Sequence, residues 1–211
     1  MTDTPLDQRE RTELCDLLLD LGHDAPTLCE GWTTLDLAAH LVVREREPRA
    51  SAGLVISRFA PYLQRRQDAW ADKGLEACVA RLRSGPPRFP WRVPGVRNFL
   101  NLNEYAIHHE DVRRANGMSR RTDRHDLDDA IWGMLKRGAR FSARKLQGVG
   151  LDVVRPDGER AQARKGEPKA ELHGPPLELL LYLSGRKGVA EVELTGPDDA
   201  VATVTTAPFG L

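Results

Sequence analysis

The first two thirds of the chain carry apolar residues at helical spacing. A first helix is predicted to begin after Thr4 and to end at Gly22, because glycine favours helix ends. A second helix is predicted from Thr33 or Thr34, since Thr33 and Asp36 have the spacing of a capping box. The apolar positions that define these helices are Leu14, Leu17, Leu18 and Leu21 in the first and the run 35–43 in the second.

Further helical segments follow. Residues 50–84 predict one or two helices that are interrupted near Pro61. The stretch 85–95 is rich in proline and predicts an extended loop, because proline removes a backbone donor and restricts the residue before it. Two longer helices are then expected, from about residue 96 to 116 and from about 127 to 147.

From Gly150 onward, short segments with alternating apolar and polar residues predict strands. These segments are 151–154, 159–165, 169–172, 189–194 and 200–207. One helix is expected among them, over 177–183, because two prolines precede it and Gly185 follows it. The predicted fold class is therefore α+β, with a helical bundle over residues 1–147 followed by a small α+β domain over 150–211.

Composition narrows the classes of function. The chain has 31 Lys and Arg against 31 Asp and Glu, whereas nucleic-acid binding needs an excess of cations, so no nucleic-acid partner is expected. No apolar run reaches the roughly 18 residues of a membrane span, and the N-terminus lacks the pattern of a secretory signal. The three cysteines stand far apart, which favours the reducing cytoplasm over a disulfide-bonded protein.

Four polar residues are predicted to share one face of the helix 96–116. At 3.6 residues per turn, Asn101, Glu104, His108 and Asp111 fall within a sector of about 80°. Apolar residues flank this sector on both sides, so it should face the core. The neighbouring His109, Glu110, Arg113 and Arg114 fall elsewhere and are expected to be solvated. A buried carboxylate is costly unless it is paired or binds a cation.

His40 supplies a partner for this face from the second helix, where it stands among apolar residues. Two imidazoles and one carboxylate, on His40, His108 and Glu104, suit zinc, with iron or nickel as alternatives, and leave coordination positions open. Asp111 could accept a hydrogen bond from a ligand histidine. The alternative is a core histidine and a polar i,i+4 pair without any metal.

The strings CEGWTTLDLAAHL (29–41) and NEYAIHHEDVRRANG (103–117) resemble the DinB-like superfamily, in particular its mycothiol-dependent maleylpyruvate isomerase branch. The resemblance implies a four-helix bundle with a divalent metal, typically zinc, on His40, Glu104 and His108. It also implies a trailing α+β domain, in which Arg186 is the candidate for a functional arginine that binds an anionic group. Arginine outnumbers lysine in this chain, which agrees with the GC-rich actinobacteria that use the thiol mycothiol.

The sequence is compatible with three functions. The first is a mycothiol-dependent isomerase or S-transferase that acts on a small electrophile at the metal. The second is a metal-binding or ligand-binding protein without catalysis on the same bundle. The third is a regulatory module in which the metal is a structural clip. Trp32 is expected to pack under its helix and Cys29 to be inert, and the substrate and the oligomeric state are left open.

Overall fold

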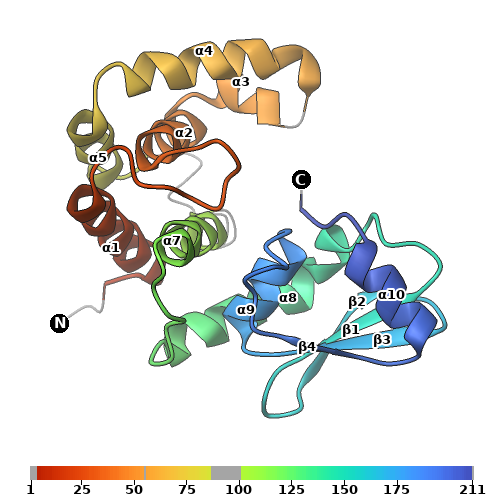
Figure 1. Cartoon of the computed structure of the whole chain (residues 1–211). Helices are drawn as coiled ribbons and strands as arrows, with labels where there is room; N and C mark the ends of the chain where they lie inside the picture. Colours follow the sequence, from red (N-terminus) through yellow and green to blue (C-terminus); the bar gives the residue numbers. More distant parts are fainter. Residues whose placement is uncertain (1–3, 55, 87–100, 211) are drawn as a thin grey trace. The chain divides into compact units, whose positions relative to one another are not determined.

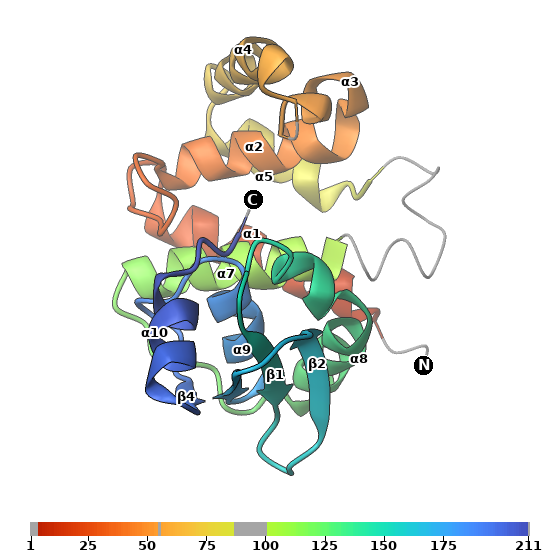
Figure 2. The same cartoon turned by 90° about the vertical axis from the view of Figure 1, so that its right-hand side faces the viewer.

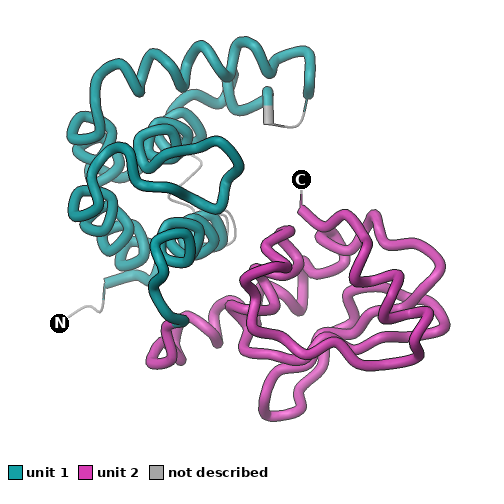
Figure 3. The backbone as a smooth tube through the Cα atoms, in the orientation of Figure 1, with its two compact units in different colours: residues 1–120 teal, residues 121–211 magenta. Residues whose placement is uncertain are grey.

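The computed structural model describes residues 4–54, 56–86 and 101–210. The fold is α+β, as predicted: helices dominate the N-terminal part, and a four-stranded sheet lies in the C-terminal part (Figure 1). The chain divides into two compact units, residues 1–120 and 121–211 (Figure 3). None of the helices in the described residues combines the length and apolarity that crossing a bilayer requires.

The first unit is helical. Its core draws buried residues from four helices, among them Leu14, Leu37, Cys78 and Tyr105, while α4 lies beyond α2 on the side away from α7 (Figures 1 and 2). The elements of this unit are α1 (Leu6–Leu21), α2 (Thr34–Arg46), α3 (Pro48–Ser51), η1 (Ala52–Leu54), η2 (Ser57–Phe59), α4 (Ala60–Ala71), α5 (Leu75–Arg83) and α7 (Asn103–Ala115).

Local signals in the sequence define the ends of these helices well. Gly22 has φ of 81° and accepts the left-handed conformation that ends α1. The capping box at the start of α2 is complete: the Thr33 backbone donates to Asp36, and the Asp36 backbone donates to Thr33. Pro61 lies in the first turn of α4, which follows the short helical turns α3, η1 and η2, so the helices of residues 50–84 are interrupted near Pro61 as predicted.

The second unit contains the sheet. Its strand order is β2-β1-β3-β4, and β1 pairs antiparallel with β2 and parallel with β3. The apolar residues of the paired strands, such as Leu151, Val153 and Leu172, are buried. The elements of this unit are α8 (His125–Ser142), β1 (Gly150–Val154), β2 (Arg160–Arg164), β3 (Lys169–His173), α9 (Pro176–Leu183), β4 (Glu193–Thr195) and α10 (Asp198–Thr206).

The helix α8 belongs to the sheet-containing unit, although it was expected to close the helical bundle of residues 1–147. The change from helix to strand does occur at Gly150, but the compact unit begins earlier, at residue 121. The reason is that α8 packs on β2 and α9. Its buried Trp132 donates from Nε1 to Glu159 Oε2 at 2.5 Å, and Asp128 accepts from the Leu177 backbone N–H at 3.0 Å.

Residues 200–206 are helical, so the prediction of a strand over 200–207 was wrong. The apolar positions that matter are Ala200 and Val204, which are four residues apart and buried. Threonine favours strands, but the hydroxyls of Thr203 and Thr205 donate to carbonyls four residues earlier, which helical threonines can do. The predicted strand 189–194 is also shorter than expected and shifted, to Glu193–Thr195. Most of the predicted loop 85–95 lies outside the described residues.

Candidate metal centre

Three side chains from two helices converge in the first unit. His40 lies on α2, and Glu104 and His108 lie one turn apart on α7. Each offers one nitrogen or carboxylate oxygen, and these atoms all lie within 4.8 Å of one another. His108 Nε2 is 3.4 Å from Glu104 Oε2, and the His40 and His108 rings are 5.6 Å apart between centroids. The structure thus brings together the three residues that the sequence predicted as ligands.

The sequence explains why these residues meet. The capping box fixes the first turn of α2, and His40 lies among its buried residues Ala39 and Leu41. On α7 the four-residue spacing places Glu104 and His108 on one face. His40 and His108 are both more than 90% buried, whereas the Glu104 side chain is 29% exposed. The cluster is therefore enclosed at the imidazoles and reachable by solvent at the carboxylate.

Each histidine is held by a second side chain at its Nδ1 atom. His108 Nδ1 lies 2.9 Å from Asp111 Oδ2, which is the partner that the sequence suggested. His40 Nδ1 lies 2.9 Å from Gln67 Nε2, on α4, which the sequence did not suggest. These contacts leave Nε2 of each ring for the centre of the cluster. Metal-binding histidines are commonly held in this way.

A positive charge lies beside the carboxylate. Arg44, one turn after His40 on α2, has its Nε 3.2 Å from Glu104 Oε2. Burial opposes ionisation of Glu104, but the hydrogen bond with His108 and the charge of Arg44 outweigh it and lower the pKa of this carboxyl group to about 2. Glu104 is therefore ionised at neutral pH, as a metal ligand must be.

The two imidazoles have opposite tendencies. Burial, reinforced by the neighbouring His108, lowers the pKa of His40 to about 3, so this ring is neutral at pH 7. Burial also disfavours a charged His108, but its hydrogen bonds with Asp111, Cys29 and Glu104 raise its pKa well above the usual value. The side chains around His108 thus attract positive charge, which is the electrostatic condition for a cation site.

Asn101 is a buried polar residue whose side chain lacks a hydrogen-bond partner among the described residues. It is fully buried one turn before Glu104, in the polar sector that the helical wheel predicted. Its Oδ1 and Nδ2 have no hydrogen-bond partner among the described residues. A buried polar group without a partner typically costs about 1–3 kcal/mol. The donor set of the cluster and this orphaned amide both fit a site that holds an additional polar group or ion.

The opposite face of α7 is also buried, so the expectation that it is solvated was wrong. His109 is 4% exposed and its Nδ1 lies 3.2 Å from Glu10 Oε2 of α1. Glu110 is fully buried and accepts from Arg114 at 2.7 Å. The cause is α1, which packs on this side of α7. Glu10, Glu13 and His109 form a second group of close donor atoms, which no pattern in the sequence indicated.

Cys29 touches the cluster from the loop before α2. Its Sγ lies 3.4 Å from Asp111 Oδ2 and 3.9 Å from His108 Nδ1, and these three residues form a third group with close donor atoms. An inert thiol was expected, because neither a basic residue nor a CxxC partner is near Cys29 in the sequence. The contact depends on how the loop packs against α7, where the Leu28 backbone N–H donates to the Asp111 carbonyl.

The three thiols should differ in reactivity. Burial raises the pKa of both Cys15 and Cys78 to about 11, so at pH 8 roughly one thiol in a thousand is ionised at each position. We expect an alkylating reagent at pH 8 to label Cys29 alone in the folded protein and all three cysteines in denaturant. Mass spectrometry of the labelled protein measures this. Native labelling of Cys15 or Cys78 at the rate of a free thiol would contradict it.

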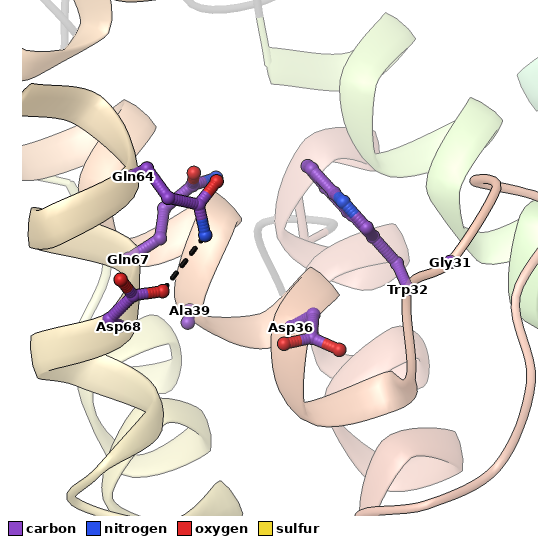
Figure 4. A pocket seen from close by; sticks show the side chains of 7 residues that line it. All are labelled: Gly31, Trp32, Asp36, Ala39, Gln64, Gln67 and Asp68. Carbon is purple, nitrogen blue, oxygen red and sulfur yellow. Dashed lines mark hydrogen bonds between the residues drawn. The ribbon is translucent and has the colours of Figure 1, made fainter. Parts of the chain in front are cut away.

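A cavity of about 200 Å³ is lined by residues of α2, α4 and the loop before α2 (Figure 4). Its lining residues are Gly31, Trp32, Asp36, Ala39, Gln64, Gln67 and Asp68. Two of them contact His40: the Trp32 ring lies 4.9 Å from it between centroids, and Gln67 makes the hydrogen bond to Nδ1. Trp32 therefore packs both on the core and on the cluster.

Arg186 belongs to the second unit, directly after α9. Its backbone N–H donates to the Leu181 carbonyl, and its Nη1 donates to the Ser184 carbonyl at 2.8 Å. Gly185, with φ of 92°, provides the turn that ends the helix as the sequence predicted. A functional role for Arg186 stays a prediction.

Two solved structures resemble the whole chain. The crystal structure of the mycothiol-dependent maleylpyruvate isomerase is 21% identical, with a TM-score of 0.54, and that of its histidine-to-alanine mutant is 19% identical, with a TM-score of 0.57. Each match covers 92% of this chain and 94% of the other. The chain has the fold of this isomerase. No family model and no curated protein matches the sequence.

The shared fold confirms the resemblance inferred from the two sequence strings. Because the match spans nearly the full length of both chains, it includes the α+β unit as well as the helical one. At this level of identity, the comparison establishes the architecture, and function must be argued from the residues of the site itself.

Proposed function

We propose that His40, Glu104 and His108 bind one divalent metal ion in a DinB-like four-helix bundle formed by α1, α2, α5 and α7. The observation that carries this proposal is the convergence of three donor atoms within 4.8 Å, from helices far apart in sequence. Support comes from the ionised Glu104 and from the contacts at both Nδ1 atoms, which leave the Nε2 atoms for an ion. Two imidazoles and a carboxylate favour zinc, with nickel or iron as alternatives.

We propose further that the protein is a cytoplasmic, mycothiol-dependent isomerase or S-transferase that acts on a small electrophile. An ion held by three side chains has an open coordination position, where it would favour ionisation of a thiol at neutral pH. The chain supplies the surroundings for such a ligand: Glu104 is partly exposed, and two residues that line the cavity, Trp32 and Gln67, contact His40. Arg186 is the candidate for binding an anionic group of the substrate.

A second candidate function, metal-free ligand binding on the same bundle, is favoured by one specific contact. Arg44 lies 3.2 Å from Glu104 and compensates part of its negative charge without any metal. If this pair satisfies the site, the bundle would hold a ligand in the cavity and perform no metal chemistry. Metal content separates the two candidates, and turnover of a thiol with an electrophile separates an enzyme from a binding protein.

The thiol proposal makes a calorimetric prediction. Mycothiol titrated into the metal-loaded protein should give a binding isotherm. The metal-free Glu104→Ala variant should give none, because it does not hold the ion that would stabilise the thiolate. Glu30→Ala, which removes an exposed carboxylate of the same unit, is the matched control and should bind like the wild type. Equal affinity for the loaded protein and Glu104→Ala, or no binding to the loaded protein at millimolar thiol, would remove the thiol proposal.

A further inference from the structure

Gln67 differs from the other polar residues that α4 contributes to the cavity wall. Gln64 and Asp68 are exposed and pair with each other at 2.8 Å (Figure 4). Gln67 is only 6% exposed and is directed to the His40 side of the helix. Burying an amide is costly unless it forms hydrogen bonds. The contact of Gln67 with His40 Nδ1, at 2.9 Å, supplies such a bond and explains why the amide is buried.

An amide can make this contact in two ways. Either its NH₂ group donates to an unprotonated Nδ1, or its oxygen accepts from a protonated Nδ1. A neutral imidazole carries one proton, so in the first case Nε2 is protonated and cannot bind a metal. In the second case Nε2 is free of its proton and is available as a ligand. The contact therefore controls which His40 nitrogen can bind an ion.

We infer that Gln67 is a positioning residue for His40. Its Nε2 faces Nδ1 at 2.9 Å, and a half-turn of the amide presents the oxygen instead, which accepts from Nδ1–H and so fixes both the ring and the tautomer in which Nε2 can bind the metal. The inference rests on the proposed function, since it assigns a role in the same site. The ring is restrained from a second direction by Trp32, 4.9 Å away between centroids. Trp32 and Gln67 thus hold His40 from the loop before α2 and from α4.

The residues that contact Nδ1 of the two histidines differ in charge. His108 is paired with the carboxylate of Asp111, which increases the donor strength of an imidazole. His40 is paired with a neutral amide, which fixes its orientation without adding negative charge. If only one of the two ligand histidines is hydrogen-bonded to a carboxylate, the ion keeps more positive charge than if both are. We therefore expect a carboxylate at position 67 to tighten metal binding and to change the electronic environment of the ion.

The experiment measures metal affinity directly, by competition with a chromogenic chelator for Zn²⁺. Gln67→Met removes the hydrogen bond with little change of volume and should weaken Zn²⁺ binding roughly 10- to 100-fold. Gln67→Glu restores an acceptor and should bind at least as tightly as the wild type. Gln64→Met, on the exposed side of the same helix, is the control and should leave affinity unchanged. A purely structural role for Gln67 would leave the Zn²⁺ affinity of Gln67→Met unchanged, because methionine keeps the volume and removes only the hydrogen bond.

A spectroscopic measurement makes the test independent of folding effects. In the Co²⁺-loaded protein, the visible absorption bands should shift in Gln67→Glu and not in the Gln64→Met control. Wild-type affinity in Gln67→Met, or a Co²⁺ spectrum of Gln67→Glu identical to that of the wild type, would overturn the inference. If the wild-type chain binds neither Zn²⁺ nor Co²⁺, the proposed function fails instead, so the two failures are distinguishable.

Discussion

Replacing His40 or His108 by alanine is expected to remove most of the divalent metal from a protein that otherwise carries about one equivalent per chain. Each substitution deletes one of only three protein ligands, and two remaining ligands do not form the three-ligand arrangement of reactive zinc sites. Elemental analysis of purified protein, after dialysis against metal-free buffer, gives the metal content. The His40→Ala/His108→Ala double variant should contain essentially none, and full occupancy in it would refute the assignment.

Matched variants distinguish this site from the two other groups of close donor atoms. His23→Ala removes an exposed histidine of the same unit and should leave the metal content unchanged. His109→Gln disrupts the group with Glu10 and Glu13, and Cys29→Ser disrupts the group with Asp111. If the ion is held by His40, Glu104 and His108, neither variant should lose it. Loss in His109→Gln alone would place the metal on the opposite face of α7.

The candidate site was largely predictable because its signals are local. Glu104 and His108 are one helical turn apart, so the spacing alone places them on one face. The expectation that His40 meets them required only that two helices with apolar stripes pack together. The capping box at Thr33 and Asp36 likewise depends on residues three positions apart, and the structure contains it as predicted.

The remaining features depend on contacts between residues far apart in sequence. Gln67 is 27 positions from His40 and looks like any polar residue of an amphipathic helix. The boundary between the units depends on how α8 packs, and the helical pattern of residues 125–142 is the same whether its partner is a helix or a sheet. In α10 the threonines favoured a strand, but the buried pair Ala200 and Val204 decided the structure.

A buried ion pair in the first unit also joins residues that are far apart in sequence. Arg11 on α1 and Glu45 on α2 are 3% and 1% exposed, and Arg11 Nη2 lies 2.6 Å from Glu45 Oε1. Arg11 also donates to the Leu82 carbonyl at 3.0 Å, and the Tyr105 hydroxyl donates to Glu45. One charged pair thus connects α1, α2, α5 and α7, and two of these helices, α2 and α7, also carry the candidate metal ligands.

Breaking this pair should destabilise the protein strongly. Glu45→Gln leaves the Arg11 guanidinium buried without a counter-ion, which typically costs about 3–5 kcal/mol. Denaturant titration in the presence of a chelator measures the free energy of unfolding without a contribution from bound metal. Asp16→Asn breaks the exposed pair with Arg83, whose side chains are 54% and 44% exposed, and should cost less than about 1 kcal/mol.

The double variant Arg11→Met/Glu45→Gln decides whether the uncompensated charge is the cause. It removes both charges and keeps an amide oxygen that can accept from Tyr105. We expect it to be more stable than either Arg11→Met or Glu45→Gln alone, because a buried pair is expensive to break and much less expensive to replace. If the losses in free energy of unfolding of the two single variants simply add in the double variant, the uncompensated buried charge is not the cause of the destabilisation.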